Sequence, residues 1–274
     1  MLSIERKEYL EKKARVIRKD IIEMIYNAQS GHPGGSYSLA DVMAVLYFHD
    51  LNVDPKNPKG LNRDRVVLSK GHAAPVWYAT LAEAGFFPKE ELSHLRQINS
   101  LLQGHPCINI PGVDITTGSL GLGLSASCGI AIGAKMTGRD NVRVYAIIGD
   151  GEQGEGQIWE AAMAAAHFKL DNLTAILDRN WYQNDGPTET SLKLEPLHDK
   201  WESFGWNVID IDGHNLNQID SAFCMARETK NKPTMIIANT VKGKGTSYML
   251  DQPGLHYTPP TKEQMELTLK ELGF

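Results

Sequence analysis

The chain has few of the features that mark disulfide-rich secreted proteins, zinc-binding proteins or membrane-spanning proteins. It contains three cysteines, Cys107, Cys128 and Cys224, an odd number without C-x-x-C spacing, so neither a disulfide framework nor a zinc site is indicated. No apolar run approaches the roughly eighteen residues of a membrane span, and no signal-peptide core follows the charged start of the chain. We therefore expect a cytoplasmic protein with free thiols.

Basic stretches, repeats and linkers are scarce as well. The net charge is -5, and apart from Lys242-Gly243-Lys244 no basic segment stands out, which argues against nucleic acid as the main partner. No internal repeat, low-complexity tract or Pro/Ser linker divides the sequence. A chain of 274 residues can bury a full core, so we expect residues 1–274 to form a single domain.

What the sequence does contain is a clear β-α-β pattern near its middle. Residues 142–148 form a short, β-branched and almost uncharged run, which is typical of a buried strand. Small apolar residues recur at helical spacing over 157–169, and a second strand-like run covers 173–178. Strands joined by such a helix lie parallel, so the sequence predicts an α/β protein. Further strands are expected at 64–69, 206–211 and 234–241.

Helices are expected over most of the remaining sequence. Amphipathic or apolar patterns predict them at about 4–28, from about 39, and at 75–84, 88–99, 126–136, 215–230 and 261–272. Between the first two, residues 29–36 include three glycines and a proline. We expect a loop there that either turns tightly or lets a ligand approach closely.

The turn after each strand of the central pattern carries an oxygen-bearing side chain. Gly149-Asp150-Gly151 follows the first strand and Asn180 follows the second. Because neighbouring parallel strands end at the same edge of a sheet, Asp150 and Asn180 can converge there. Their oxygens and a loop carbonyl suit Mg2+ or Ca2+ and leave coordination positions for phosphate. Gly151 allows a ligand close to the backbone, so these residues indicate a metal-bridged diphosphate site.

Four of the nine histidines stand apart because they lie in expected loops. They are His32, His72, His105 and His256, and the first three directly follow a glycine. Such side chains could line a polar pocket and donate to phosphate, hydroxyl or developing alkoxide oxygens. The other five lie in expected helices or in a turn and are assigned ordinary structural roles: His49, His94, His167, His198 and His214.

A glycine-rich run at 118–123 precedes the helix expected at 126–136, as a dinucleotide-binding loop would. Its glycine order is reversed and no strand leads into it, which argues against a nicotinamide site. The small residues of the following helix instead favour close packing against a neighbour.

Taken in order along the chain, these segments resemble the amino-terminal part of transketolase. Gly149-Asp150-Gly151, with Asn180 about thirty residues later, is similar to the thiamine diphosphate fingerprint. Arg179 stands where many members have the first of two asparagines. Further matches in register are 30–34, 69–72, 104–106, 117–121 and the loop at 243–256. The resemblance implies the thiamine diphosphate-binding fold over residues 1–274, α/β with a mostly parallel central sheet and helices on both faces.

The resemblance also implies roles for individual residues. The metal would be held by Asp150, Asn180 and the main-chain carbonyl of Tyr182. The catalytic residues would be His32, His105 and His256, which face the sugar, and Glu155, at the contact between two cofactor sites. Thiamine diphosphate would be bound by His72, Gly118, Ser119, Leu120, Gly149, Asp150, Gly151, Glu152, Asn180 and His256.

Three residues depart from the family pattern. Ser119 stands where many members have proline, Leu122 where many have glutamine, and Tyr257 where glycine is common. These differences leave the cofactor chemistry intact and affect the expected shape of the sugar channel.

The resemblance ends before the part of transketolase that carries the glutamate needed to generate the reactive ylide. We therefore expect the amino-terminal subunit of a split transketolase, completed by a carboxy-terminal subunit with the pyrimidine-binding and C-terminal domains in an α2β2 assembly. With thiamine diphosphate and Mg2+ or Ca2+, such an enzyme would transfer a two-carbon ketol (glycolaldehyde) unit from a ketose donor to an aldose acceptor. Both sugars would be phosphates or similar anionic compounds.

Two other functions are open on sequence alone. The α-type subunit of a 2-oxoacid dehydrogenase shares the fingerprint, but the loop histidines His32, His72 and His105 argue against it. The other is a non-catalytic paralogue that binds thiamine diphosphate, and the intact metal-site and histidine positions weigh against that function.

Overall fold

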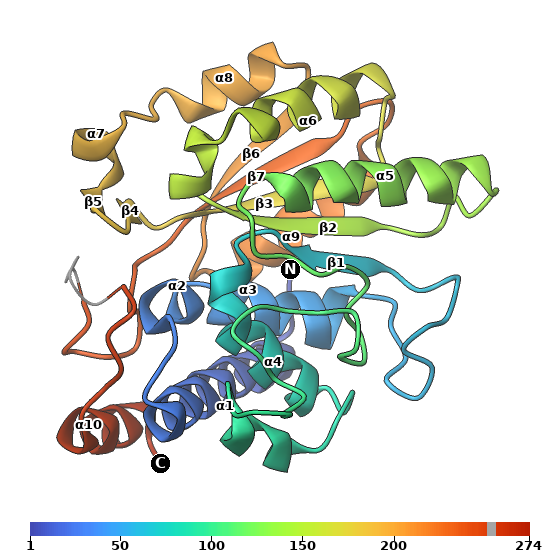
Figure 1. Cartoon of the computed structure of the whole chain (residues 1–274). Coiled ribbons are helices and arrows are strands. Elements are labelled where there is room, and N and C mark those ends of the chain that lie inside the picture. The colour runs from blue at the N-terminus through green and yellow to red at the C-terminus, as the bar shows by residue number, and fades with distance from the viewer. Residues whose placement is uncertain (251–255) are drawn as a thin grey trace.

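The computed structural model describes residues 1–250 and 256–274, and its central element is a parallel sheet (Figure 1). In this described part of the chain the sheet has five strands in the order β1-β2-β3-β7-β6. Their bounds are Arg65–Leu68 (β1), Val144–Gly149 (β2), Leu173–Arg179 (β3), Thr234–Asn239 (β7) and Asn207–Asp212 (β6). Every neighbouring pair is parallel, so all the strands end at one edge. The strands predicted from sequence are confirmed.

Helices cover both faces of this sheet (Figure 1). One face packs against α1 (Ile4–Ala28), α3 (Ala40–Val45), α4 (Ala74–Glu83) and α9 (Leu216–Glu228), and the other against α5 (Leu122–Met136), α6 (Gly156–His167) and α8 (Leu197–Ser203). Successive residues of a strand point to opposite faces. Tyr145 and Ile147 of β2 accordingly join the first core, and Val144, Ala146 and Ile148 join the second. The predicted α/β fold is confirmed.

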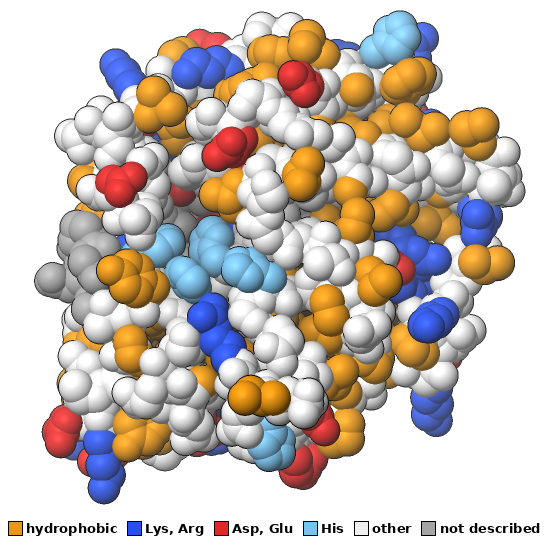
Figure 2. Space-filling view, viewed as in Figure 1, with side chains coloured by type: hydrophobic (Ala, Val, Ile, Leu, Met, Phe, Trp, Pro, Cys, Tyr) orange, Lys and Arg blue, Asp and Glu red, His pale blue; other side chains and the backbone are white. Residues whose placement is uncertain are grey.

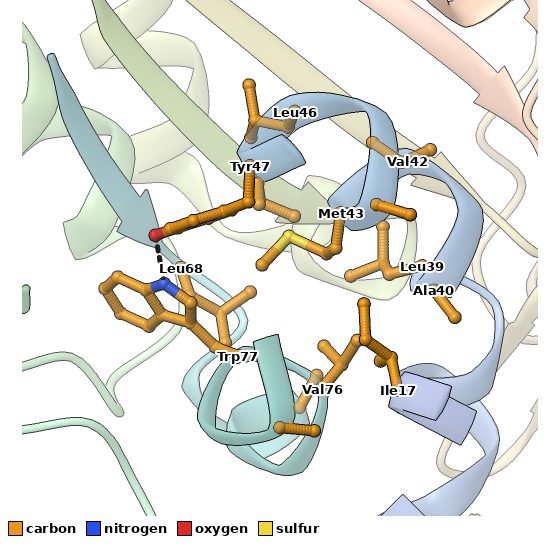
Figure 3. Close-up of a cluster of buried hydrophobic side chains, with 14 of the residues drawn as sticks. Ile17, Leu39, Ala40, Val42, Met43, Leu46, Tyr47, Leu68, Val76 and Trp77 are labelled. Carbon is orange, nitrogen blue, oxygen red and sulfur yellow. Dashed lines mark hydrogen bonds between the residues drawn. The ribbon is translucent and has the colours of Figure 1, made fainter. Parts of the chain in front are cut away.

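The larger core lies between the sheet and the amino-terminal helices (Figure 3). Ile17 of α1, Met43 of α3 and Val76 of α4 belong to it, and all three are fully buried. Trp77 is also fully buried, and its indole Nε1–H donates to the Tyr47 hydroxyl at 2.5 Å. That bond satisfies the indole in otherwise apolar surroundings. The core thus holds the helices, and the loops that leave them, in place against the sheet.

Capping residues explain why the first and last helices are found with nearly their predicted bounds. The Ser3 hydroxyl accepts the N–H of Arg6 at the start of α1, as preferred N-cap residues do. At the other end of the chain, α10 (Lys262–Leu272) begins with a capping box between Thr261 and Gln264 and ends at Gly273, with φ of 83°.

The helix predicted at 88–99 is wrong. The chain forms only a 3-10 segment there, Lys89–His94 (η3), followed by turns in which Arg96 and Asn99 have φ of 60° and 64°. The Ser93 hydroxyl donates to the carbonyl of Glu90 at 2.7 Å. Such side-chain bonds to the nearby main chain compete with helical pairing.

The glycine-rich loop predicted at 29–36 is also partly wrong, because Pro33–Tyr37 forms a short helix, α2. Proline favours the first position of a helix, and a Cβ on Gly34 would lie only 2.8 Å from Cε of Lys242. Close packing against that lysine therefore needs glycine. The next helix begins at Ala40 without a side-chain cap, and the Ser38 hydroxyl before it donates to Asp178 at 2.7 Å.

Short elements complete the described part of the chain. They are a π-helical turn at Leu46–Asp50 (η1), 3-10 turns at Gly71–Ala73 (η2) and Gly151–Gly154 (η4), a hairpin of Tyr182–Gln183 (β4) and Gly186–Pro187 (β5), and the helix Thr188–Ser191 (α7). Of the predicted match at 243–256, residues 251–255 lie outside the described residues. A search of the described helices finds none with the length and apolar character needed to cross a membrane.

Candidate active site

A cavity of about 470 Å³ opens at the edge where the strands end. Histidine side chains gather at this hollow in the face shown in Figure 2. Of the residues predicted from sequence, the following line the cavity: His32, His72, Gly118, Leu120, Gly149, Asp150, Gly151, Glu152, Glu155, Asn180, Tyr182 and His256. The fold therefore brings together segments that are more than two hundred residues apart in the sequence, from His32 to His256.

Two predicted residues do not line the cavity. His105 is exposed and lies against the lining residue Gly118, where an added Cβ would be 3.5 Å from the His105 Cδ2 atom. Ser119 is not among the lining residues, although its neighbours Gly118 and Leu120 are. Both roles stay predictions.

Asp150 is held firmly at the end of β2. One carboxylate oxygen accepts the N–H of Gly151 at 2.8 Å, and the other accepts the N–H of Trp181 at 2.6 Å and a weaker bond from Arg179 at 3.4 Å. Burial and nearby Asp178 together raise the pKa of Asp150 to about 6, although Arg179 opposes them. Nearby positive charge therefore only partly offsets the cost of burying this carboxylate, which suits a cation-binding role.

Asn180 supplies a second oxygen at the same edge, after β3. Its amide nitrogen donates to Asp178 at 2.8 Å, and its amide oxygen accepts the N–H of Tyr182 at 3.2 Å. Within the described residues no group of three or more His, Cys, Asp or Glu is arranged to hold a metal. A metal here would therefore depend on one carboxylate together with amide and main-chain oxygens, a donor set that fits Mg2+ or Ca2+.

A buried ion pair lies directly beneath the cavity. Lys70, at the end of β1, pairs with Asp178 of β3, and their side chains are 2% and 0% exposed. Lys70 also donates to the Gly35 carbonyl at 3.0 Å. Burial alone would raise the pKa of Asp178, but Lys70 and the hydroxyls of Ser38 and Thr240 hold it below its usual value. The contacts of Lys70 and Asp178 thus connect α2 with the ends of β1, β3 and β7.

Lys242 is a second cation at the cavity, and sequence analysis missed it. It follows β7, is 3% exposed and lines the cavity, with Nζ 5.3 Å from the ring centroid of Tyr182. Burial lowers the pKa of Lys242, and the carboxylate of Asp150 opposes that effect. The available signal was its position, because a residue just past a parallel strand lies at the edge where ligands bind.

The three histidines that line the cavity, and His105 beside it, are neutral at pH 7. Burial lowers the pKa of His32 to about 4, with Arg96 contributing, and that of His256 to about 3, with Lys242 contributing. Burial also moves the pKa of His72 well below its usual value and lowers that of His105. A neutral imidazole has one donor and one acceptor, so each ring can donate one hydrogen bond and accept another.

The rings of three histidines face one another across a short distance. The centroid of His32 is 5.2 Å from that of His72 and 5.4 Å from that of His256. The Nδ1 atoms of His32 and His256 are buried and have no hydrogen-bond partner among the described residues. Buried polar atoms are normally paired, so these two point to a polar ligand that completes the site.

Glu152 and Glu155 have different surroundings, although both line the cavity. The Glu152 carboxylate is buried and accepts bonds from Ser69 at 2.5 Å and from the N–H groups of Gly121 and Gly149 at 2.7 and 2.9 Å. It therefore holds two cavity loops together. Glu155 is exposed at the start of α6, where a second protein chain can reach it.

Lining residues that sequence analysis missed come from segments next to those it identified: Gly35, Lys70, Gln183, Asn184, Asp185 and Lys242. Lys70 directly precedes Gly71-His72, and Gln183 to Asp185 directly follow Tyr182. Proximity in sequence to a predicted ligand was the signal that could have found four of them.

Residues 9–274 match the family model described as "Transketolase, thiamine diphosphate binding domain". The chain belongs to the transketolase family. Two transketolase relatives are subunits of similar length. An apulose-4-phosphate transketolase subunit of Phocaeicola vulgatus is 44% identical over 266 residues, 97% of this chain and 94% of that protein. The 6-deoxy-6-sulfo-D-fructose transketolase subunit SqwG of Clostridium sp. is 47% identical over 264 residues, 96% of each chain.

A solved transketolase has the same fold. The crystal structure of transketolase from Campylobacter jejuni superposes with a TM-score of 0.93 at 34% identity and covers 100% of this chain. The match takes in only 43% of the Campylobacter chain. This chain therefore spans less than half of that transketolase and corresponds to its thiamine diphosphate-binding domain.

Proposed function

We propose that residues 1–274 form one thiamine diphosphate-binding domain and act as the amino-terminal subunit of a two-chain transketolase. The enzyme transfers a two-carbon ketol unit from a ketose to an aldose. The observation that carries this proposal is the cavity itself, where Asp150 and Asn180 lie beside three neutral histidines. Relatives of almost the same length that are named transketolase subunits support it.

In this proposal each group at the cavity has a defined task. Bound thiamine diphosphate supplies an electron-accepting thiazolium for cleavage of the donor's C2–C3 bond. Asp150, Asn180 and the Tyr182 carbonyl would hold Mg2+ or Ca2+, which would supply positive charge for the diphosphate. His72 and the main chain at Gly151 contact the diphosphate.

The remaining histidines act on the sugar. His32 and His256 are neutral and buried, so they donate hydrogen bonds to its hydroxyls and can move a proton as charge develops on oxygen. His105, at the wall, contacts the first hydroxyl of the donor. The relatives' names include a sugar phosphate and a sulfo-sugar, which supports an anionic sugar as the substrate here.

A carboxy-terminal subunit completes the site in this proposal, in an α2β2 assembly. The outer faces of α5 and α6 support it, since Leu122, Met136 and Met163 are 47%, 81% and 55% exposed. A Cβ added to Gly129 or Gly133 would meet nothing within 4 Å, so another chain can approach α5 closely. Large apolar side chains exposed on neighbouring helices mark an interaction surface. The cytoplasm stays the predicted location.

The partner surface can be tested by substitution. Leu122→Glu should block co-purification with the carboxy-terminal subunit, whereas Leu267→Glu, at a 43% exposed leucine of α10, should not. Light scattering of the wild-type complex should give the mass expected for two copies of each chain. Assembly of Leu122→Glu with normal yield and mass would contradict the proposed surface.

The activity is tested by donor cleavage with thiamine diphosphate and Mg2+, with and without the co-expressed carboxy-terminal subunit. We expect cleavage of ketoses only when both chains are present, and a panel of phosphorylated and sulfonated ketoses would identify the donor. Cleavage of 2-oxoacids instead would favour the dehydrogenase subunit. Cofactor binding without cleavage of any donor by the assembled complex would favour a non-catalytic paralogue.

A further inference from the structure

A buried hydrogen-bonded group lies beside the cavity and involves His214, a histidine whose sequence context indicated only a structural role. Arg18 of α1 holds Asp41 of α3 with both terminal nitrogens, at 3.0 and 2.7 Å. The same carboxylate lies 2.7 Å from Nδ1 of His214, which follows β6. The three side chains are 7%, 12% and 11% exposed. Burial alone would raise the pKa of Asp41, but Arg18 and His214 hold it well below its usual value.

This group holds both ends of the turn at 241–244. The N–H of Val241 donates to Nε2 of His214 at 2.9 Å, and the carbonyl of Lys244 accepts from Nε of Arg18 at 2.9 Å. The turn is closed by the N–H of Lys244, which donates to the Val241 carbonyl at 3.1 Å. Because His214 and Arg18 are both bound to Asp41, one carboxylate fixes the turn from two sides.

The hydrogen bonds also define the protonation of His214. The main-chain N–H of Val241 can only donate, so Nε2 must present its lone pair. Nδ1 therefore carries the proton and donates it to Asp41. The neutral imidazole is thus a bridge, oriented by a carboxylate on one side and accepting a main-chain N–H on the other.

The turn matters because it carries Lys242 into the cavity. The Lys242 side chain passes over Gly34, where an added Cβ would lie 2.8 Å from Cε, and the next N–H, of Gly243, donates to the Gly34 carbonyl at 3.3 Å. A lysine side chain has several rotatable bonds and much conformational freedom to lose. A rigid main chain on both sides limits where its ammonium can go.

We propose that His214, oriented by Asp41 and Arg18, is a positioning residue for the cofactor. By accepting the Val241 N–H it keeps Lys242 directed at the end of the cavity that Asp150, Gly151 and His72 line. This inference rests on the proposed binding of thiamine diphosphate. It means that cofactor binding also depends on a histidine about 30 residues before Lys242, in the turn after β6.

Two substitutions separate the roles of the two ring nitrogens. Asparagine places its amide near the Nδ1 position and cannot reach Val241, whereas glutamine places an amide oxygen near Nε2 that can accept the Val241 N–H. We expect His214→Asn to weaken thiamine diphosphate binding about tenfold, as loss of one buried hydrogen bond would. His214→Gln should stay within about threefold of the wild type. Equal losses in both variants would overturn the proposal.

The binding measurement is a fluorescence titration of the cofactor into this chain assembled with its carboxy-terminal subunit. His198→Asn is the matched control, because His198 also pairs with a carboxylate, Asp210, but is 45% exposed and does not line the cavity. It should bind like the wild type. A tenfold loss in this control as well would show that the assay reports general damage, and would count against a specific role for His214.

A double-mutant cycle distinguishes positioning from folding. If His214 acts through Lys242, His214→Asn should change the cofactor affinity little in a Lys242→Ala background. The same loss in both backgrounds would mean that His214 acts on the fold as a whole, which would overturn the proposal.

Hydrogen exchange tests the contact without any cofactor. In the full chain, a peptide spanning 240–246 should exchange faster in His214→Asn than in the wild type or in His214→Gln. Unchanged exchange in His214→Asn would overturn the proposal. If the wild type failed to bind thiamine diphosphate, the proposed function would fail, yet the exchange result would still decide whether His214 holds the turn.

Discussion

The ion pair beneath the cavity leads to a stability prediction of definite size. Replacing Lys70 by methionine keeps most of the apolar stem but leaves Asp178 charged in surroundings where its side chain is 0% exposed. Removing one partner of a buried pair costs about 3–5 kcal/mol, because an uncompensated charge remains. The lost bond to the Gly35 carbonyl adds about 1 kcal/mol. We expect Lys70→Met to lower the free energy of unfolding by roughly 5 kcal/mol.

Urea unfolding of the full chain, followed by tryptophan fluorescence, measures this loss. Lys7→Met is the matched control, because Lys7 and Glu11 are 3.7 Å apart with exposures of 50% and 51%, and exposed pairs contribute only about 0–1 kcal/mol. The double variant Lys70→Met/Asp178→Asn should recover part of the loss, since no unpaired charge remains. A loss below about 1 kcal/mol in Lys70→Met would refute the reasoning, because the pair would then be solvated.

Three further predictions concern the cavity. The pKa of His32 is about 4, below the unfolded value of about 6.5, so its contribution to stability is present above that pH and is lost as the pH falls towards 4. His32→Asn should therefore flatten the urea-measured loss of stability between pH 7 and 5 by about 1 kcal/mol, and an identical profile would contradict this. His105→Ala in the assembled enzyme should slow donor cleavage about a hundredfold, and unchanged donor kinetics would exclude its predicted contact. Asp150→Asn should abolish the Mg2+ dependence of thiamine diphosphate binding in calorimetric titrations, whereas equal dependence in variant and wild type would place the metal elsewhere.

The fold could be predicted from sequence because its elements follow from local patterns. The buried strands are short and β-branched, and the long helices have regular apolar stripes with caps at their ends. The failure at 88–99 has a local cause that periodicity does not detect, since serine side chains there bond to the nearby main chain. The helix at Pro33–Tyr37 was missed because Gly34 is needed for contact with Lys242, which is distant in sequence.

The candidate site was predictable where chemistry follows directly from position in the chain. Asp150 and Asn180 end neighbouring parallel strands, so their convergence follows from topology alone. The roles of Lys70 and His214 do not follow from topology, because their partners are far away in sequence. Lys70 is 108 residues from Asp178, and His214 is 173 residues from Asp41. Only the folded chain places those side chains together.

Arg179 explains how the family fingerprint can change without loss of the site. Its side chain is 1% exposed and donates to Thr188 at 2.7 Å, to Glu189 at 2.8 Å and to Glu195 at 3.0 Å. The guanidinium also lies 3.7 Å from the ring centroid of Trp181. Five N–H donors in a rigid plane make this set of contacts possible, and one asparagine amide could not make them all.

The same guanidinium reaches Asp150 at 3.4 Å, so it connects the proposed metal ligand to the segment at 181–195. That segment includes Gln183, Asn184 and Asp185 at the cavity. An asparagine in place of Arg179 would leave Glu189 and Glu195 without their cation and release the segment from the sheet edge. The arginine and the two glutamates therefore act as one unit, which shapes the cavity on the side of the hairpin next to Asp150 and Asn180.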